Sequence, residues 1–520
     1  MRDHGRHLAG WIDEAVEDNP AVIAVVDRAG QHTYAELGRA VEELTTLLRE
    51  CEVPTGSRVV TIGRNALAPV VLFLACARRG IVVSPLSWRL TVPELAHALA
   101  RVSPVMIVVD DEFLPAAQQA ADASGVAAPI LPSDHRSWPE RSTTTCRGPG
   151  GSDERSRVHA ETPLLLAHTS GTARAPKFVT LTHGNCWWAN RVLQEEFPIQ
   201  PGDAVLGVMP QYHVGGWNVF PLLALHVGAT VILPDRFDAG QALELLEKWD
   251  VVMVMGVPAH YSLLAGSPAF RDSELSSLRV ALVGGAPVSE RLRTVWRSRG
   301  VTLVEGYGLT EAGPHVLVSD HGSSSGGARQ GLRAYPGVEA RLIDAHDGST
   351  ITGPGVGELL VRSPGVFAGY LGDDVSTRDA LCNGWLRTGD RAERDTEGRY
   401  RILERLDDLI NTGGEGVSPA EVEAVLAAHP AVTDAVVVGV SDERWGQVPV
   451  AAVVIGQGRD GDLDALTSHC RERLAPYKVP TRIHVIDAVP RTDLGKVRRA
   501  ELRRLLDDHG ALAPKGSLAR

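Results

Sequence analysis

The stretch from Ala167 to Val179, AHTSGTARAPKFV, holds residues whose types and spacing suit the binding of a phosphate. It follows the apolar run Leu164-Leu165-Leu166, which predicts a short buried strand. Hydroxyls and backbone N–H groups can surround phosphate oxygens, and Lys177 adds a positive charge. A Walker loop, G-x-x-x-x-G-K-[ST], occurs nowhere in the chain. Since loops rich in Ser, Thr and Gly are mostly ordinary turns, this stretch taken by itself favours a turn.

Five further stretches combine glycine with residues that can hold a nucleotide, a cation or an acyl group. Thr310 and Glu311 place a hydroxyl and a carboxylate on a turn flanked by glycine, which suits a phosphate and its Mg²⁺. Taken singly, each stretch has an ordinary interpretation, such as a turn or the start of a solvated basic helix. The five stretches are Met209–Trp217 (MPQYHVGGW), Gly306–Glu311 (GYGLTE), Gly384–Asp390 (GWLRTGD), Arg405–Glu415 with Ser418–Glu423 behind it, and Pro490–Arg499 (PRTDLGKVRR).

Length and composition limit the classes of protein to consider. A chain of 520 residues with 44% hydrophobic and 22% charged residues is typical of a soluble protein of several domains. Its net charge of −12 argues against nucleic acid or an anionic membrane as the main partner. No apolar run approaches the roughly 18 residues that span a bilayer, and the first residues lack the apolar region of a signal peptide. The 6 scattered cysteines, without a C-x-x-C pair, predict reduced thiols, a cytoplasmic location and no zinc site.

Apolar runs and helical patterns alternate along much of the chain, which predicts α/β units around a largely parallel sheet. A second α/β series is expected from Ala204 to Leu317, a β-rich section from 335 to 403, and a compact α+β segment after Arg405. The polar, glycine-rich residues 141–160 and 319–331 predict exposed loops. In the first series, strands are expected at Val22–Val26, Val59–Ile62, Ile81–Val83 and Val105–Val109, and helices at Tyr34–Arg49 and Pro69–Arg78.

In their order, these stretches resemble the motifs of the adenylate-forming superfamily of acyl-CoA synthetases, peptide-synthetase adenylation domains and luciferases. The resemblance extends from about Trp11 to Leu505, and six motifs in the same order make coincidence negligible. It implies a large N-terminal AMP-binding domain at 1–404, built of α/β subdomains with a β-rich section. A hinge at 405–409 and a small mobile α+β C-terminal domain at 410–520 would follow.

Within that superfamily the chain is most similar to the acyl-CoA synthetase branch. Peptide-synthetase domains usually hold the substrate amine with an Asp just after the Tyr/His-type motif, whereas Gly215–Phe220 contains no acid. No carrier-protein domain is expected after Leu505. The resemblance implies that a carboxylate attacks the α-phosphate of ATP to form an acyl-adenylate, and that CoA then displaces AMP. The segments that resemble this branch are 357–370, Gly413–Glu415, Asp442–Gln447 and Ala475–Pro480.

The resemblance also assigns residues to the nucleotide. Tyr307 would stack on adenine, Thr310 would contact the α-phosphate, and Glu311 would hold Mg²⁺. Asp390 would accept both ribose hydroxyls with the help of Arg405, in keeping with the acceptor capacity of a carboxylate and the rigid fork of Arg. Lys177 is counted as catalytic with Thr310 and Glu311, and the other nucleotide-binding positions are Thr169, Ser170, Gly171, Thr172, Gly284, Gly285, Ala286, Gly306 and Gly308.

Lys496 would bridge the substrate carboxylate and the phosphate while charge develops in the first half-reaction. Rotation of the C-terminal domain about Asp407 would then withdraw Lys496 and present the CoA-binding residues. These residues are Gly413, Gly414, Glu415, Trp445, Gly446, Tyr477 and Lys478.

The acyl pocket is expected from Trp187–Val192, Trp217–Phe220 and Ala312–His315. It would be roomy and mostly apolar with aromatic walls, which favours an aryl, alicyclic or medium-chain acid without a free α-amine. His213 would guard this pocket, with a packed loop histidine as the alternative. The pocket residues are Trp217, Asn218, Phe220 and His315.

The opening loop departs from the family pattern T-S-G-T-T-G-x-P-K-G. Ala173 stands for a hydroxyl residue, and Arg174 and Phe178 stand for glycines. A left-handed conformation would cost a non-Gly residue roughly 1–2 kcal/mol. One hypothesis is therefore a non-adenylating variant that mainly transfers a preformed acyl-adenylate to CoA. The favoured alternative is that Arg174 adds a phosphate contact and that both half-reactions run.

Two other classes are weaker. A binding-only pseudoenzyme is opposed by the presence of Lys496, Asp390 and Glu311, and a kinase or ATPase that releases ADP is opposed by the missing Walker loop. The expected ligands are therefore ATP or AMP, Mg²⁺, CoA and a small carboxylic acid. The sequence leaves the acyl group and the oligomeric state open, with a homodimer as one option.

Overall fold

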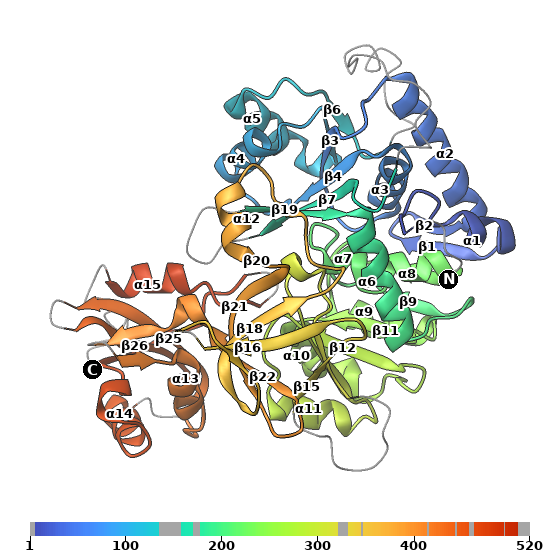
Figure 1. Ribbon diagram of the computed structural model, residues 1–520. Coiled ribbons are helices and arrows are strands. Elements are labelled where there is room, and N and C mark those ends of the chain that lie inside the picture. Colours follow the sequence, from blue (N-terminus) through green and yellow to red (C-terminus); the bar gives the residue numbers. More distant parts are fainter. Residues whose placement is uncertain are drawn as a thin grey trace, which may run out of the picture. The chain divides into compact units, whose positions relative to one another are not determined.

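A computed structural model describes residues 6–134, 158–169, 177–320, 331–344, 347–412, 415–442, 445–456, 462–492 and 495–507 (Figure 1). Contacts divide the chain into two compact units. Unit 1 consists of Met1–Ser170, Pro176–Ala340 and Val361–Leu386, and unit 2 consists of Gly171–Ala175, Arg341–Leu360 and Arg387–Arg520. The domain boundary at 404 and the hinge at 405–409 stay predictions. Most of the predicted loops at 141–160 and 319–331 lie outside the described residues.

The first sheet of unit 1 has the strand order β19-β8-β7-β4-β3-β5-β6. The strands β3 to β6 and the pair β4–β7 are parallel, and β8 and β19 continue the sheet in antiparallel fashion. β7 is buried at Leu164–Ala167, which confirms the strand predicted before the opening loop. The strands are β3 (Arg58–Ile62), β4 (Val82–Leu86), β5 (Met106–Val109), β6 (Ile130–Pro132), β7 (Pro163–Thr169), β8 (Lys177–Thr182) and β19 (Gly369–Tyr370).

Helices of this region begin and end where local signals place them. Thr33 and Glu36 form a capping box at the start of α2, and Gly80 ends α3 with φ 62°. α4 and α5, which lie side by side in Figure 1, pack apolar residues such as Leu99 and Ala120 against β3 and β5. The helices are α1 (Asp13–Asp18), α2 (Tyr34–Glu50), α3 (Leu67–Arg79), α4 (Val92–Val102), α5 (Leu114–Ser124) and α6 (His183–Glu196).

The second sheet of unit 1 has the order β15-β14-β13-β12-β11-β9-β10-β1-β2. The strand at Val22–Val26 was expected in the first sheet, but β1 pairs in parallel with β10, far along the chain. Strand propensity depends on residues close in sequence, whereas the strand beside which a given strand pairs depends on the whole fold. The strands are β1 (Ile23–Asp27), β2 (Gly30–Thr33), β9 (Ala204–Leu206), β10 (Thr230–Ile232), β11 (Met253–Gly256), β12 (Val280–Gly284), β13 (Leu303–Tyr307), β14 (Leu317–Ser319) and β15 (Leu332–Ala334).

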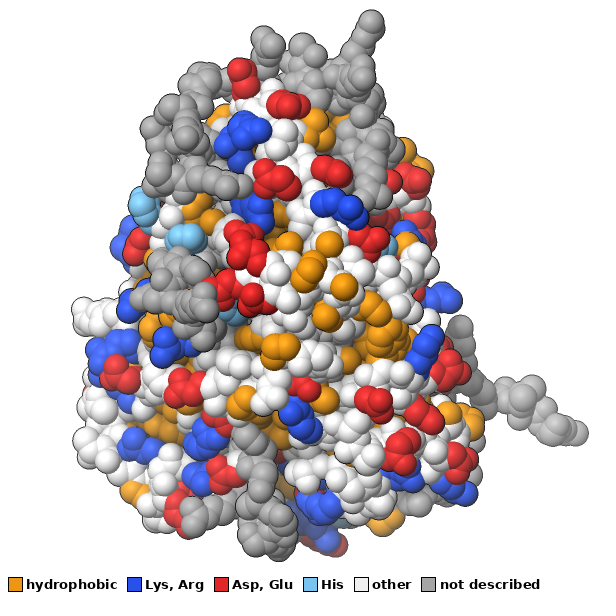
Figure 2. Space-filling model, turned by 90° about the vertical axis from the view of Figure 1, so that its right-hand side faces the viewer, with side chains coloured by type: hydrophobic (Ala, Val, Ile, Leu, Met, Phe, Trp, Pro, Cys, Tyr) orange, Lys and Arg blue, Asp and Glu red, His pale blue; other side chains and the backbone are white. Residues whose placement is uncertain are grey.

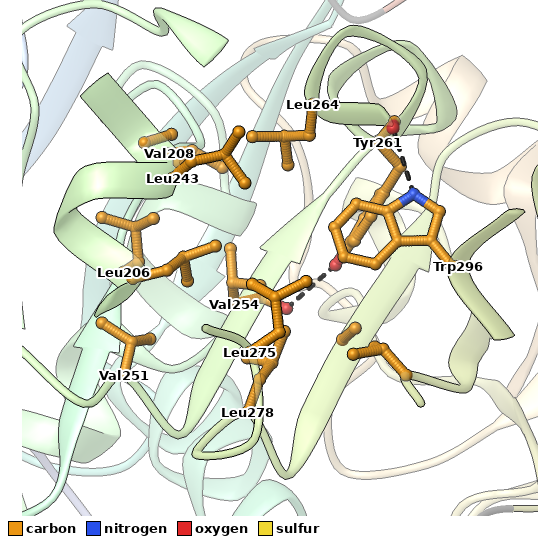
Figure 3. Close-up of a cluster of buried hydrophobic side chains, with 14 of the residues drawn as sticks. Leu206, Val208, Leu243, Val251, Val254, Tyr261, Leu264, Leu275, Leu278 and Trp296 are labelled. Carbon is orange, nitrogen blue, oxygen red and sulfur yellow. Dashed lines mark hydrogen bonds between the residues drawn. The ribbon is translucent and has the colours of Figure 1, made fainter. Parts of the chain in front are cut away.

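A hydrophobic cluster packs against β9, β11 and β12 of this sheet (Figure 3). Trp296 and Tyr261 are fully buried within it, with ring centroids 5.1 Å apart in an edge-on arrangement. Trp296 Nε1 donates to the Tyr261 carbonyl oxygen at 3.1 Å, and the Tyr261 hydroxyl donates to the Val254 carbonyl oxygen at 3.2 Å. Both rings therefore bury their polar atoms with partners. The helices of this region are α7 (Gly215–Asn218), α8 (Pro221–Val227), α9 (Ala239–Lys248), α10 (Pro258–Gly266) and α11 (Glu290–Arg297).

The expected β-rich section is confirmed between residues 335 and 405. Its strands are short, and antiparallel pairs join β16 to β17 and β21 to β22. One helix of the described residues, α12 (Asp374–Ala380), interrupts them. The strands are β16 (Glu339–Ile343), β17 (Thr350–Ile351), β18 (Gly355–Arg362), β20 (Leu381–Cys382), β21 (Trp385–Arg394) and β22 (Tyr400–Arg405).

The chain after Arg405 forms the expected α+β arrangement. β25 and β26 are long antiparallel strands rich in valine, and successive side chains point to opposite faces. Val436 and Val438 pack with residues of α15, whereas Val437 and Val453 pack with residues of α13 and α14. Figure 1 shows α15 on one side of these strands and α13 and α14 on the other. The elements are η7 (Leu406–Asp408), β23 (Ile410–Thr412), β24 (Glu415–Val417), α13 (Pro419–Ala427), β25 (Val432–Asp442), β26 (Gly446–Ile455), α14 (Leu463–Arg471), η8 (Pro476–Lys478), β27 (Arg482–Val485) and α15 (Arg499–Asp507).

Charged side chains of both signs are interspersed with hydrophobic ones on the face drawn in Figure 2. A mixture of this kind keeps a single-sign electrostatic field from building up over that face. None of the helices in the described parts of the chain is both long and apolar enough to cross a bilayer.

Candidate active site

β7 and β8, the two strands that flank the predicted phosphate loop, form an antiparallel pair. Thr169 lies opposite Lys177, and Thr169 Oγ1 donates a hydrogen bond to the Lys177 carbonyl oxygen at 3.2 Å. The two ends of the loop are thereby held together. Ser170, Gly171 and Thr172, together with Ala173 and Arg174, lie outside the described residues, and the roles assigned to them stay predictions.

The prediction that Phe178 strains the backbone is wrong. Phe178 lies within β8 opposite His168, where the backbone is extended and open to any L-residue. Its side chain is 2% exposed and packs in the cluster that contains Val60 and Leu166. The ring centroid of Phe178 is 5.1 Å from that of His168. Phe178 therefore contributes to the core of the first sheet.

Tyr370 connects the lysine of the opening loop to the carboxylate predicted to hold Mg²⁺. Its hydroxyl lies 3.0 Å from Glu311 Oε1, and Lys177 Nζ lies 4.4 Å from the centroid of its ring. Tyr370 is placed by β19, which pairs with β8 so that Tyr370 lies opposite Val179. A phenolic hydroxyl donates well to a carboxylate, and an ammonium is attracted to the face of an aromatic ring. These contacts bring Lys177 and Glu311, far apart in sequence, to one place.

The predicted nucleotide-binding glycines lie at the carboxyl ends of two neighbouring parallel strands, β12 and β13. Gly284 is opposite Gly306 in that ladder, and Gly285 follows with φ 81°. A Cβ atom on Gly308 would lie 1.7 Å from the Pro314 carbonyl oxygen, so only glycine fits there. Carboxyl ends of parallel strands are where α/β proteins bind ligands. Ala286 follows Gly285, and Tyr307 ends β13.

Thr310 and Glu311 are the first two residues of the short helix η6 (Thr310–Ala312), which is followed by Gly313 with φ 65°. Both side chains are partly exposed. A hydroxyl and a carboxylate on one turn supply the oxygen ligands that Mg²⁺ prefers. The parts of the chain that the structure describes hold no group of three or more His, Cys, Asp or Glu able to bind a metal by themselves. The donor set thus fits Mg²⁺ only if phosphate oxygens of the nucleotide complete its coordination.

In unit 2, Asp390 and Arg405 face each other across β21 and β22. Arg405 Nε lies 2.8 Å from Asp390 Oδ1, and the side chains are 44% and 5% exposed, respectively. The Asp390 backbone N–H donates to Thr388 Oγ1 at 3.0 Å, and the Thr388 hydroxyl donates to the Leu359 carbonyl oxygen at 2.7 Å. The Asp390 carboxylate is therefore buried next to a cation, and its predicted role of accepting the ribose hydroxyls stays a prediction.

The predicted acyl-pocket residues lie close together and are buried. Trp217, Asn218, Phe220 and His315 are each at most 2% exposed. Trp217 stacks on Phe73 with centroids 4.7 Å apart, and Phe220 has the unusual φ of 77° for a bulky residue. The two aromatic residues are thus packed in the interior, and the polar residues Asn218 and His315 are buried as well. Their role in binding an acyl group stays a prediction.

His213 lies on the segment that leads into α7. Its carbonyl oxygen accepts from the Gly216 N–H at 2.9 Å, and its ring centroid lies 4.7 Å from that of Tyr212. Its side chain is partly buried. The indole N–H of Trp217 donates to the Gln211 carbonyl oxygen, which ties the segment to α7. Both interpretations of His213, the pocket guard and the packed loop residue, stay open.

The CoA-binding residues that the structure describes lie on the sheet formed by β23 to β27 and beside it. The side chain of Trp445 is 45% exposed, and its backbone N–H donates to Asp442 Oδ1 at 2.9 Å. Gly446 has φ 76° and pairs with Thr412 of β23. Tyr477 is 40% exposed, and the neighbouring Lys478 pairs with Glu421 at 2.7 Å. That contact raises the pKa of Lys478. Glu415 begins β24, and Gly413 and Gly414 lie outside the described residues.

Lys496 lies exposed on a tight loop of unit 2 that is closed by the bridge Arg491–Val497. The Thr492 N–H donates to the Lys496 carbonyl oxygen at 2.7 Å, and the Lys496 N–H donates to Thr492 Oγ1 at 3.2 Å. Arg491 holds the base of the loop through Asp434 on β25 at 2.8 Å and the Gly495 carbonyl oxygen at 2.9 Å. Lys496 is thus held by hydrogen bonds of its backbone to Thr492.

Sequence reasoning missed Tyr370 and Asn190 as site residues and Arg491 as a support of the Lys496 loop. Tyr370 ends the stretch 357–370 and Arg491 belongs to the stretch around Lys496, so both were within recognised motifs. The sequence pointed to Asn190 only through the range Trp187–Val192, which was expected to line the acyl pocket. In each case the contact that matters joins residues far apart in the sequence.

A family model described as AMP-binding enzyme matches residues 12–371, and a second, described as AMP-binding enzyme C-terminal domain, matches residues 421–496. The chain belongs to the AMP-binding enzyme family. The predicted resemblance to the adenylate-forming superfamily is thereby confirmed, and so is the mixed α/β fold with a large N-terminal and a small C-terminal part.

Relatives of this AMP-binding enzyme cover nearly its whole length. It is 36% identical to a feruloyl-CoA synthase of Amycolatopsis sp over 97% of this chain and 99% of the relative. It is 34% identical to an indoleacetate–CoA ligase of Aromatoleum aromaticum over 96% of this chain and 98% of the relative. Among solved structures, o-succinylbenzoate CoA synthetase from Bacillus subtilis with its acyl-adenylate intermediate has a TM-score of 0.80 and 27% identity, with 95% and 98% covered. The AMP-binding enzyme thus lies in the acyl-CoA synthetase branch.

Proposed function

We propose that this AMP-binding enzyme activates an apolar aryl acid with ATP and transfers the acyl group to CoA, with release of AMP. It is an acyl-CoA ligase of the AMP-forming type, like the relatives that match it over their whole length. The observation that supports the substrate class is the buried aromatic region around Trp217 and Phe220, where Gly215–Phe220 offers no carboxylate to an α-amine. The relatives named for feruloyl and indoleacetyl groups agree with an aryl acid. Alicyclic and medium-chain acids remain alternatives.

In the first half-reaction, the acid carboxylate attacks the α-phosphorus of ATP, and pyrophosphate leaves. Lys496 would place its ammonium between the attacking carboxylate and the phosphate, where negative charge develops. Thr310 would donate its hydroxyl to the α-phosphate, and Asp390 would accept the ribose hydroxyls beside Arg405. Tyr307 would stack on adenine. Each role matches a chemical capacity of the side chain.

Mg²⁺ would neutralise phosphate charge when bound, and Glu311 with Thr310 would hold it from the protein side. Tyr370 would keep Glu311 oriented through the contact at 3.0 Å to Oε1. Lys177 would contact the outer phosphates from the end of the opening loop, where the ring of Tyr370 supports its ammonium.

In the second half-reaction, the CoA thiolate attacks the acyl carbon of the adenylate and AMP leaves. Exposed Trp445 and Tyr477 would contact CoA. The other residues proposed to bind CoA are Gly413, Gly414, Glu415, Gly446 and Lys478. Asp407, on η7 between β22 and β23, would act as the hinge of the C-terminal domain.

The non-adenylating hypothesis is not favoured. Its physical basis included backbone strain at Phe178, which lies in an ordinary strand. The relatives that match over nearly their whole length are named feruloyl-CoA synthase and indoleacetate–CoA ligase. The pseudoenzyme and the ADP-forming alternatives are likewise not favoured. A cytoplasmic location and a homodimer remain proposals based on the sequence.

The experiment that tests this function is a CoA-thioester assay over a panel of aryl, alicyclic, fatty and amino acids. We expect ATP-dependent thioester formation with the aryl acids and AMP as the nucleotide product. Efficient conversion of an α-amino acid, or transfer to a carrier-protein thiol in preference to CoA, would contradict the proposal. Release of ADP in place of AMP would contradict the reaction type.

A further inference from the structure

Three buried polar side chains meet in the region of the predicted acyl pocket. Asn190 lies on α6, Asn218 ends α7 and His315 follows η6, and they are 0%, 1% and 2% exposed. His315 Nε2 lies 2.9 Å from the Asn218 carbonyl oxygen, and Asn190 Nδ2 donates to Asn218 Oδ1 at 3.3 Å. Buried polar atoms are normally hydrogen-bonded, so each atom of this cluster needs a partner.

Hydrogen bonds fix the orientation of the Asn190 amide. Nδ2 also donates to the Cys186 carbonyl oxygen, one helical turn earlier, at 2.8 Å. Turning the amide over would set its oxygen against two other acceptors, the Cys186 carbonyl and Asn218 Oδ1. The oxygen of Asn190 is therefore directed away from them, and it has no hydrogen-bond partner among the residues that the structure describes.

Aromatic residues lie beside two members of the cluster, since Phe220 follows Asn218 by two residues and Tyr335 contacts His315. Phe220 lies edge-on to Phe197 with centroids 6.1 Å apart, and the His315 ring lies 5.3 Å from the ring of Tyr335. Burial lowers the pKa of His315 to about 4, so the neutral imidazole donates through Nε2 to the Asn218 carbonyl. In apolar surroundings an unpaired acceptor is unfavourable, and a ligand that brings a donor to it gains correspondingly.

We propose that Asn190 Oδ1 accepts a hydrogen bond from a donor on the ring of the acid, so that the enzyme selects aryl acids with a phenolic hydroxyl or a ring N–H remote from the carboxyl group. The inference rests on the proposed function. An aryl acid without a donor leaves Asn190 Oδ1 unpaired, and a methyl ether at the same position sets a second acceptor beside it.

The expected selectivity follows from general experience with buried polar groups. A site built to hydrogen-bond a substrate hydroxyl or N–H can reject the analogue without it by up to roughly 10⁴–10⁵, whereas one methylene changes selectivity only roughly 10–200-fold. Because a single acceptor carries this contact, we expect the donor-bearing acid to be favoured by about 10³-fold in kcat/KM, which lies between these two ranges.

The test compares acids that differ only in the donor, with ATP and CoA present. One set is cinnamate, 4-hydroxycinnamate and 4-methoxycinnamate, and the other is indole-3-acetate and its N-methyl derivative. A preference for the donor-bearing acid in either set supports the inference, and the set that shows it tells a hydroxyl from a ring N–H. Equal conversion within both sets would overturn it while leaving the proposed function standing. Absence of a thioester from every acid would instead count against the proposed function itself.

Variants then assign the preference to Asn190. Asn190→Leu removes the acceptor at similar volume, and we expect it to abolish the preference, so that the two acids of a set are converted with similar kcat/KM. Leu193→Ala, on the same helix, 0% exposed and outside the predicted acyl pocket, is the control, because a general packing defect affects both acids of a set alike. A preference retained in Asn190→Leu would overturn the assignment. Should the leucine variant fail to fold, Asn190→Ala gives the same readout without a new side chain, and the wild-type ratios decide by themselves.

Discussion

Asp390 and Arg405 lie opposite each other across β21 and β22, with Arg405 Nε 2.8 Å from Asp390 Oδ1. The carboxylate is almost fully buried, while the guanidinium is partly exposed. If this carboxylate binds the ribose, Asp390→Asn should raise the KM for ATP by roughly 10–10²-fold. Hydrogen bonds to a charged group contribute about 1.5–3 kcal/mol, and each 1.4 kcal/mol is tenfold. Glu393→Gln, in the exposed pair with Arg401 of the same two strands, is the matched control. An unchanged KM for ATP in Asp390→Asn would remove Asp390 from the nucleotide site.

Tyr370 offers a way to separate two contacts with two substitutions. Tyr370→Phe removes the donor to Glu311 and keeps the ring beneath Lys177, whereas Tyr370→Leu removes both. We expect Tyr370→Phe to raise the Mg²⁺ concentration needed for ATP binding several-fold, measured by calorimetry at varied Mg²⁺. Tyr370→Leu should weaken ATP binding further, by about 0.5–2 kcal/mol. The control is Tyr261→Phe, a core change that should lower Tm without altering the Mg²⁺ dependence. Equal Mg²⁺ dependence in wild type and Tyr370→Phe would rule out this role for the hydroxyl.

The Lys496 loop is expected to serve the first half-reaction alone. Lys496→Ala should abolish ATP-dependent thioester formation, because a preorganised group at a developing charge contributes roughly 3–4 kcal/mol. Thioester formation from a supplied acyl-adenylate should remain close to that of wild type. Pyrophosphate exchange and single-turnover assays measure the two halves separately. Loss of both halves in a folded variant would assign Lys496 to CoA binding or to structure.

Phe178 should now be treated as a core residue. Phe178→Gly, which restores the family pattern at that position, should lower the free energy of unfolding by about 3–5 kcal/mol, and the loss of strand propensity adds about 0.5–1 kcal/mol. Phe178→Leu should cost much less, because most of the buried apolar volume remains. Denaturant titration measures both. A stable Phe178→Gly variant with faster pyrophosphate exchange would revive the idea that this residue distorts the phosphate loop.

Buried histidines make the stability of the protein depend on pH. Burial lowers the pKa of His183 to about 3 and that of His260 and His315 to about 4. In the unfolded chain these pKa values are near 6.5, so below about pH 6.5 the unfolded state binds more protons. The free energy of unfolding should therefore fall as the pH drops from about 6.5 to 4, by up to about 1.4 kcal/mol per pH unit for each histidine. Above about pH 6.5 the three histidines are neutral in both states, and their full contribution to the free energy of unfolding is present.

Denaturant titrations between pH 7 and pH 4 measure this dependence. His260→Gln should flatten the slope, because one buried histidine no longer titrates. His97→Gln, at an exposed position, is the control and should leave the slope as in wild type. The same slope in His260→Gln and wild type would show that His260 does not account for the effect.

Patterns of residues close in sequence were sufficient to predict most helices and strands and the order of the motifs. The runs at Val59–Ile62 and Val105–Val109 became β3 and β5, and Tyr34–Arg49 became α2, because alternation, helical periodicity and caps depend on residues close in sequence. The same holds for Gly308, whose motif marked it before the structure showed that no side chain fits there. Family and reaction type followed from the order of these local signals.

Only the tertiary structure decided which distant residues meet. It placed β1 beside β10, set Phe178 in the core of the first sheet, and joined Glu311 to Lys177 through Tyr370. It also left the Asn190 oxygen buried without a partner among the described residues. The physical reason is that pairing, burial and hydrogen-bond satisfaction depend on groups brought together by the whole fold, and periodicity along the chain carries no record of them.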